Sequence, residues 1–78
     1  MATITMYGAD WCSDCRRSKA LLDGLGTDYE YVDIEKEVDG AARALAISGR
    51  TSIPVVVFPD GSFQVEPSDA ELSAKLAA

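Results

Sequence analysis

The sequence contains no histidine, which excludes histidine-ligated metals and any Cys–His catalytic pair. Basic residues are also few, because seven Lys and Arg stand against thirteen Asp and Glu for a formal net charge of −6. Nucleic acids and anionic membranes bind basic surfaces, so neither is an expected partner. No apolar run approaches the roughly 20 residues of a membrane span, and the N-terminus lacks the basic and apolar segments of a signal peptide. We therefore expect a cytoplasmic protein.

Cysteine is scarce, and the only two, Cys12 and Cys15, stand close together. In the cytoplasm paired cysteines are rarely structural staples, and a transient catalytic disulfide is the commoner use. Two thiols separated by two residues, between a strand-like and a helix-like segment, are typical of a redox pair. The 78 residues, 47% of them apolar, are enough for one small core. We expect residues 1–78 to form a single domain and a monomer.

The order of apolar and turn residues predicts an α/β fold. Strands are expected over residues 3–7, 29–34, 54–58 and 62–65, and helices over residues 13–25, about 37–47 and 68–76. The last helix begins with a capping box, Ser68 and Glu71. The run Val55-Val56-Val57-Phe58 suggests a central strand buried on both faces. The order β-α-β-α-β-β-α predicts a four-stranded mixed sheet with helices on both faces.

Helical periodicity also predicts which helix faces are buried. In the first helix the expected buried stripe is Cys15, Ser18, Leu22 and Leu25. In the second it is Val38, Ala41, Ala42 and Leu45. Gly40 is expected to weaken the second helix by about 1 kcal/mol relative to alanine.

Cys12 is the expected nucleophile because it lies at the start of the first helix. The free N–H groups there carry partial positive charge and favour a thiolate; such settings lower the pKa of a cysteine from ~8.5 to about 3.5–7.5. Cys15 lies one turn on, on the same face, and is expected to be deeper and to resolve the mixed disulfide. Asp14 opposes the thiolate, whereas Arg16 and Arg17 favour it.

Three motifs together resemble the glutaredoxin and thioredoxin superfamily, over essentially the whole chain. They are Trp11-Cys12-x-x-Cys15, Ser52-Ile53-Pro54 and Pro67-Ser68-Asp69. Within that superfamily the chain is most similar to the small bacterial glutaredoxin-like redoxins, the mycoredoxins in particular. The resemblance implies a thioredoxin fold and a thiol–disulfide oxidoreductase.

The resemblance also implies a binding site for substrate and thiol. It implies that Pro54 is cis and opposite Cys12, and that the backbone of Ile53 pairs with the substrate. The helix start at Ser68 and Asp69 would receive a carboxylate of a thiol cofactor. From the residues themselves, Arg16 is a candidate to bind such a thiol or an acidic partner. Trp11 is either a platform for the substrate or an anchor for its own loop.

The expected partners are disulfide-containing proteins and a thiol or flavoprotein reductase system. No cofactor is expected to be bound, and a low-molecular-weight thiol, mycothiol or glutathione, is the expected co-substrate. The Pro-Tyr of many glutaredoxins is replaced by Ser13-Asp14, and the paired glycines before the last helix by Val65-Glu66-Pro67. Both departures weaken the case for glutathione.

Three alternatives stay open, of which the simplest is a pure interaction protein that uses the exposed groove. One is a redoxin that thioredoxin reductase reduces directly and that donates electrons to ribonucleotide reductase. Another is a cysteine-ligated metal module. One CxxC is half of a zinc site that two chains could complete as Cys₄, and the resemblance permits an iron–sulfur cluster bridged across a dimer.

Overall fold

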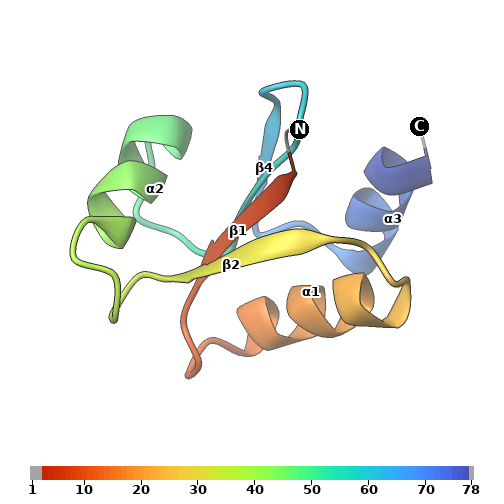
Figure 1. The fold of residues 1–78 in the computed structure, drawn as a ribbon, viewed down its shortest axis with the longest axis horizontal. Helices are drawn as coiled ribbons and strands as arrows, with labels where there is room; N and C mark the ends of the chain where they lie inside the picture. Colours follow the sequence, from red (N-terminus) through yellow and green to blue (C-terminus); the bar gives the residue numbers. More distant parts are fainter. Residues whose placement is uncertain (1–2, 78) are drawn as a thin grey trace.

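A four-stranded sheet of order β2-β1-β3-β4 forms the centre of the molecule (Figure 1). The structure, a computed structural model, describes residues 3–77. Strand β1 (Ile4–Gly8) pairs in parallel with β2 (Tyr29–Asp33) and antiparallel with β3 (Val55–Val57). Strand β4 (Phe63–Val65) completes a hairpin with β3. The predicted mixed sheet is confirmed, and the apolar strand β3 is one of its two inner strands.

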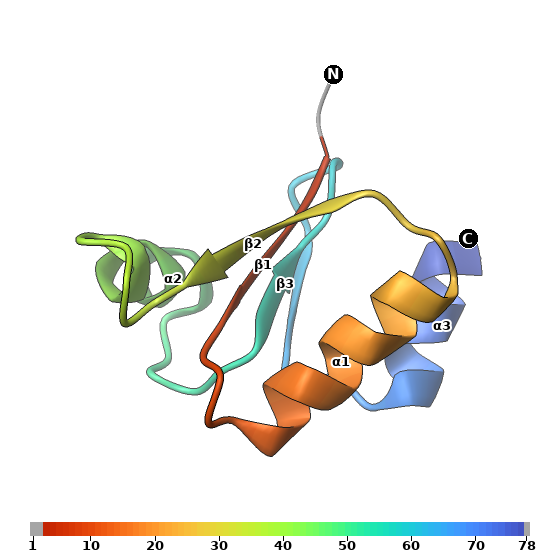
Figure 2. The same ribbon diagram turned by 60° about the horizontal axis from the view of Figure 1, so that its bottom comes forward.

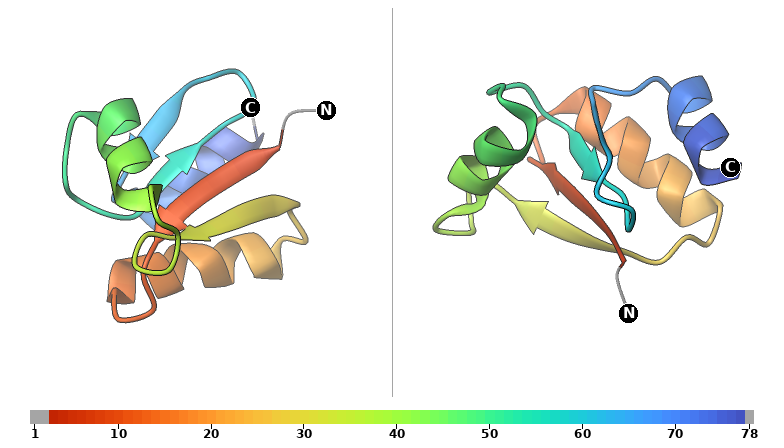
Figure 3. Two further views of the ribbon diagram at one scale, coloured as in Figure 1. Left: turned by 60° about the vertical axis from the view of Figure 1, so that its left-hand side comes forward. Right: turned by 90° about the horizontal axis from the view of Figure 1, so that it is seen from above.

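Helices cover both faces of this sheet, as predicted. Helix α1 (Ser13–Gly24) and helix α3 (Asp69–Ala77) lie side by side on one face, whereas α2 (Gly40–Ser48) covers the other (Figures 2 and 3). Helix α1 follows β1 directly, so its N-terminus lies at the carboxyl end of that strand. Cys12 and Cys15 lie at this end of the sheet.

The alternating sides of β1 and β3 divide the core in two. Between the sheet and helices α1 and α3 lie Ile4, Met6, Cys12, Cys15, Leu22, Val56, Phe58 and Leu72. Between the sheet and α2 lie Tyr7, Val32, Ala44 and Val55. Because the side-chain period of a strand is two, neighbouring residues of one strand contribute to opposite layers. Both cysteines, at the start of α1, belong to the layer between the sheet and helices α1 and α3.

The second helix begins three residues later than predicted. The predicted start was residue 37, whereas α2 begins at Gly40. Asp33 accounts for the difference, because its side chain and carbonyl oxygen accept the N–H groups that would enter a helix. Its Oδ1 accepts from Glu35 N at 2.9 Å, and its carbonyl oxygen accepts from Lys36 N at 3.1 Å and Glu37 N at 2.9 Å. These bonds hold the segment after β2 as turns.

The predicted buried stripe of α2 is wrong. Val38 is fully exposed, Leu45 is 44% exposed, and Ala41 and Ala42 also face outward. The face that packs on the sheet is Gly40 and Ala44. An added Cβ on Gly40 would lie 3.1 Å from Ile34 Cα and 3.3 Å from Val32 Cγ1, so glycine lets this helix approach β2 closely. In the first helix, likewise, Leu25 is 55% exposed rather than buried.

The register of α2 makes a stability prediction. Val38→Ser is expected to change the free energy of unfolding by no more than about 0.5 kcal/mol, because Val38 is exposed and precedes the helix. Val32→Ser, the matched change at a buried valine, is expected to cost at least about 2 kcal/mol. Urea unfolding midpoints measure both. Equal losses of unfolding free energy in the two variants would show that Val38 is buried and contradict this register.

Candidate active site

Cys12 caps the N-terminus of helix α1. Its backbone is extended, with φ −82° and ψ 114°, and its carbonyl oxygen accepts from Arg16 N at 3.0 Å. Its sulfur accepts a hydrogen bond from the backbone N–H of Cys15 at 3.2 Å. The N–H group that donates to this sulfur and the positive end of the helix dipole both place partial positive charge beside it. The local sequence thus places one sulfur of the cysteine pair where the helix begins.

Cys15 has a different environment from Cys12, although both are free thiols. Both residues are buried, but the exposed fraction is 8% for Cys12 and 1% for Cys15, so Cys12 is the nearer of the two to solvent. Burial, followed by the hydrogen bond with Cys12, raises the pKa of the Cys15 thiol to about 12. Cys15 is therefore a protonated thiol at neutral pH. The two cysteines of the pair therefore differ in burial and in hydrogen bonding.

The loop before β3 faces the sulfur of Cys12. The Ile53-Pro54 peptide bond is cis, and Pro54 is fully buried. The carbonyl oxygen of Ile53 lies 3.9 Å from Cys12 Sγ, where it accepts a long hydrogen bond from the thiol. Residues 41 positions apart are thus brought to the reacting atom. The geometry implied by the resemblance for Pro54 is present.

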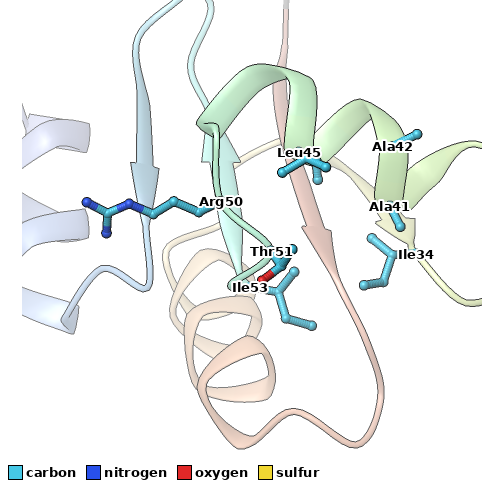
Figure 4. A pocket seen from close by; sticks show the side chains of 8 residues that line it. Ile34, Ala41, Ala42, Leu45, Arg50, Thr51 and Ile53 are labelled. Carbon is cyan, nitrogen blue, oxygen red and sulfur yellow. The ribbon is translucent and has the colours of Figure 1, made fainter.

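An apolar hollow of about 200 Å³ continues from Ile53 toward α2. Figure 4 shows Ile34, Ala41, Leu45 and Ile53 around it, with Arg50 extending away from them. Among the lining residues, Ala41, Ala42 and Leu45 belong to the outward face of α2 that the sequence analysis assigned to the core. Three of the four residues of the misplaced stripe, all except Val38, therefore form one wall of a hollow beside Ile53.

Trp11 and Arg16 flank Cys12, one on the loop before it and the other on the first turn of α1. Trp11 is 63% exposed, so a large apolar ring is open to solvent beside Cys12. Arg16 Nη1 donates to the carbonyl oxygen of Asp10 at 2.7 Å and thereby ties the first helical turn to the loop. Its guanidinium is exposed and holds the loop that carries Cys12.

The start of α3 is closed by its own side chains. The predicted capping box is present: Ser68 N donates to Glu71 Oε1 at 2.8 Å, and Glu71 N donates to Ser68 Oγ at 3.1 Å. The hydrogen bonds from Ser68 lower the pKa of the Glu71 carboxyl, so this group is ionised at neutral pH. Asp69 lies 3.3 Å from Arg17 Nε. A carboxylate of the chain itself occupies the position that the resemblance reserves for a thiol carboxylate.

Arg17 joins α1 to α3, a role that the sequence analysis did not assign to it. Its Nη1 donates to Asp14 Oδ1 at 2.9 Å, its Nη2 donates to the carbonyl oxygen of Pro67 at 2.9 Å, and its Nε pairs with Asp69. The (i, i+3) spacing from Asp14 signals the first contact. The second spans 50 residues and has no local signal. The carboxylate between the two cysteines is thereby paired.

Within residues 3–77, no group of three or more His, Cys, Asp or Glu side chains lies together in a way that could hold a metal ion. The cysteine pair itself offers two sulfur ligands. In the same part of the chain, no helix is long and apolar enough to cross a membrane.

A CxxC pair at a helix N-terminus, facing a cis-proline loop beside a mixed sheet, defines a thiol–disulfide oxidoreductase of the thioredoxin fold. The comparisons with known proteins narrow this class. The glutaredoxin family profile matches residues 4–63, and on that match the chain belongs to the glutaredoxin family.

Individual relatives agree with this assignment. Mycoredoxin 1 from Corynebacterium glutamicum is 32% identical over 80 residues, which cover 100% of this chain and 98% of that protein. The glutaredoxin-like protein NrdH of Escherichia coli is 33% identical over 60 residues, covering 77% of this chain and 73% of that protein. The crystal structure of a glutaredoxin from Archaeoglobus fulgidus superposes with a TM-score of 0.88 at 29% identity, over 100% of this chain and 89% of that one.

Proposed function

We propose that this chain reduces disulfides of proteins, and mixed disulfides, by a dithiol cycle. The Cys12 thiolate attacks one sulfur of the substrate, forms a mixed disulfide and releases the other sulfur as a thiolate. Cys15 then attacks Cys12 Sγ, which forms the Cys12–Cys15 disulfide and releases the second substrate thiol. Two electrons pass to the substrate, and an external reductant returns two to the pair. The observation that carries the proposal is the asymmetry of the two sulfurs in exposure and hydrogen bonding.

The surroundings of Cys12 support a polypeptide substrate. The carbonyl oxygen of Ile53, close to the reacting sulfur, is positioned to accept an N–H group from an extended chain. The hollow beside Ile53 suits an apolar side chain next to the substrate cysteine, and Trp11 offers an exposed apolar ring on the same loop as Cys12. Backbone pairing of the extended substrate with Ile53 contributes affinity, and the apolar surfaces favour substrates with apolar side chains next to the cysteine.

For the return of electrons we favour mycothiol over glutathione. Glutathione carries two carboxylates, whereas mycothiol carries none. The N–H of Ser68, which would receive a carboxylate at the start of α3, already donates to Glu71. Asp14, Asp69 and the formal charge of −6 add repulsion against an anionic thiol. A neutral thiol meets no such penalty.

Direct reduction by a flavoprotein thioredoxin reductase is the second candidate. A reductase is a protein and would use the same exposed apolar surface, Trp11 and the hollow beside Ile53, that suits protein substrates. The similarity to NrdH supports it, and in this case ribonucleotide reductase is the candidate acceptor.

A coupled assay separates these reductants. Reduction of one disulfide substrate is followed through NADPH consumption with glutathione and its reductase, with mycothiol and its reductase, and with thioredoxin reductase alone. We expect turnover with mycothiol at least about tenfold above that with glutathione, since one repelled or unpaired charge costs about 1.4 kcal/mol or more. Faster turnover with thioredoxin reductase alone would select the second candidate.

The matched variant Glu71→Ala tests the reason for that preference. Removing the carboxylate frees Ser68 N, so activity with glutathione should rise several-fold while activity with mycothiol stays within about twofold. Glu66→Ala, an exposed glutamate just before α3, controls for loss of one negative charge. An equal rise in both variants would assign the effect to net charge rather than to the capping box.

A further inference from the structure

The resolving step requires Cys15 to become a nucleophile although it is buried and protonated. The thiolate is the attacking form of cysteine, and a thiol with a pKa of about 12 is almost entirely protonated at neutral pH. The chain contains no histidine. The nearest carboxylate in sequence, Asp14, is paired with Arg17 and raises the pKa of Cys15 rather than lowering it. Another group must stabilise the Cys15 sulfur as it ionises.

One side-chain hydroxyl lies next to this sulfur, across Gly8. A Cβ added at Gly8, the last residue of β1, would lie 3.0 Å from Cys15 Sγ and 3.2 Å from Tyr31 Oη. The two distances together place the sulfur and the hydroxyl no more than about 6.2 Å apart. Because Gly8 has no side chain, no Cβ occupies the position that lies near both the sulfur and the hydroxyl.

We propose that the hydroxyl of Tyr31 donates a hydrogen bond to Cys15 Sγ during the resolving step and stabilises the thiolate that attacks Cys12. The proposal rests on the dithiol cycle proposed above. Tyr31 is on the central part of β2, with its ring packed in the core layer that contains both cysteines. The site is thus formed by β1, β2 and α1.

Burial keeps the hydroxyl of Tyr31 in the donating form. It raises the pKa of Tyr31 to about 12, so the phenol retains its proton at neutral pH. The charged groups that face the two side chains are Asp10 from the loop, Asp33 from β2, Asp14 from α1, and Lys19 from α1, whose Nζ lies 5.7 Å from the centre of the Tyr31 ring. Three of these four are negative and disfavour the thiolate, which increases the need for a neutral donor.

Atoms and electrons balance without any further reactant. Cys15 Sγ loses its proton to solvent and attacks Cys12 Sγ, which forms the Cys12–Cys15 bond and breaks the bond from Cys12 to the substrate sulfur. The electron pair of that bond leaves on the substrate sulfur, which takes up a proton from solvent. Tyr31 keeps its proton throughout and contributes only the hydrogen bond to the transient thiolate.

The aromatic disulfide 5,5′-dithiobis(2-nitrobenzoate) separates the two steps in a stopped-flow experiment on the reduced protein. The first equivalent of thionitrobenzoate reports the attack by Cys12 and depends on reagent concentration, and the second reports resolution by Cys15 and does not. We expect Tyr31→Phe to leave the first phase within twofold and to slow the second about tenfold at pH 7, because a hydrogen bond to an ionised group is lost. The rate–pH curve of the second phase should move up by about one pH unit.

Tyr29→Phe is the matched control, since this tyrosine is on the same strand and donates to Asp23 at 2.6 Å instead. Both phases should be unchanged in it. A second phase of unchanged rate in Tyr31→Phe would overturn the proposal, and equal slowing of both phases would assign Tyr31 a structural role only. A wild-type protein that releases one equivalent only would instead overturn the dithiol cycle.

Discussion

Replacing Cys12 with serine is expected to reduce disulfide reduction to the uncatalysed rate, a loss of at least about a thousandfold. A serine hydroxyl at the start of α1 would still accept the N–H of Cys15, because serine is a good N-cap. The fold should therefore survive while the nucleophile is lost. The rate is measured with a protein disulfide substrate under saturating reductant, and circular dichroism checks the fold.

Cys15→Ser separates the role of the first cysteine from that of the second. With its buried sulfur removed, the chain should still attack once and then remain joined to its substrate through Cys12, which mass spectrometry of the unreduced protein detects. Full turnover by Cys15→Ser with a small thiol would mean that resolution comes from outside the chain. Activity retained by Cys12→Ser would contradict the assignment of the nucleophile altogether.

The strand pattern and the redox pair could be predicted from the sequence because both are local. Runs of β-branched residues, a turn signal and a capping box each depend on neighbours within about four positions. The N-cap position of Cys12 and the capping box of Ser68 and Glu71 were therefore found in the predicted places. The cis state of Pro54 had no such local signal and came only from the resemblance.

The register of α2 could not be read in this way, because tertiary contacts override helical periodicity. The periodic stripe through Val38 and Leu45 predicts a buried face, but the three hydrogen bonds to Asp33 delay the helix and Gly40 determines which face meets β2. An apolar stripe left outside the core then becomes a surface beside the active site. Ala41, Ala42 and Leu45, three of the four residues for which the prediction was wrong, line the apolar hollow beside Ile53.

Gly8→Ala is expected to lower the free energy of unfolding by about 1–3 kcal/mol, as overpacking does in a filled core. The added methyl group would lie 3.0 Å from Cys15 Sγ and 3.1 Å from Cys15 Cβ, and the second atom is fixed to the backbone of α1. The helix must therefore move away from the sheet, which should also slow resolution. Gly24→Ala is the matched control, because nothing lies within 4 Å of its Cβ position.

In that control, alanine near the end of α1 should leave stability unchanged or raise it by up to about 1 kcal/mol. Urea unfolding of the reduced proteins measures both variants, and equal effects would mean that the space at Gly8 has no structural consequence. Because both variants replace glycine with alanine, a loss of stability at Gly8 and a gain at Gly24 would be due to the position of the added methyl group. At Gly8, the last residue of β1, the absence of one methyl group lets the buried sulfur of Cys15 lie against the sheet.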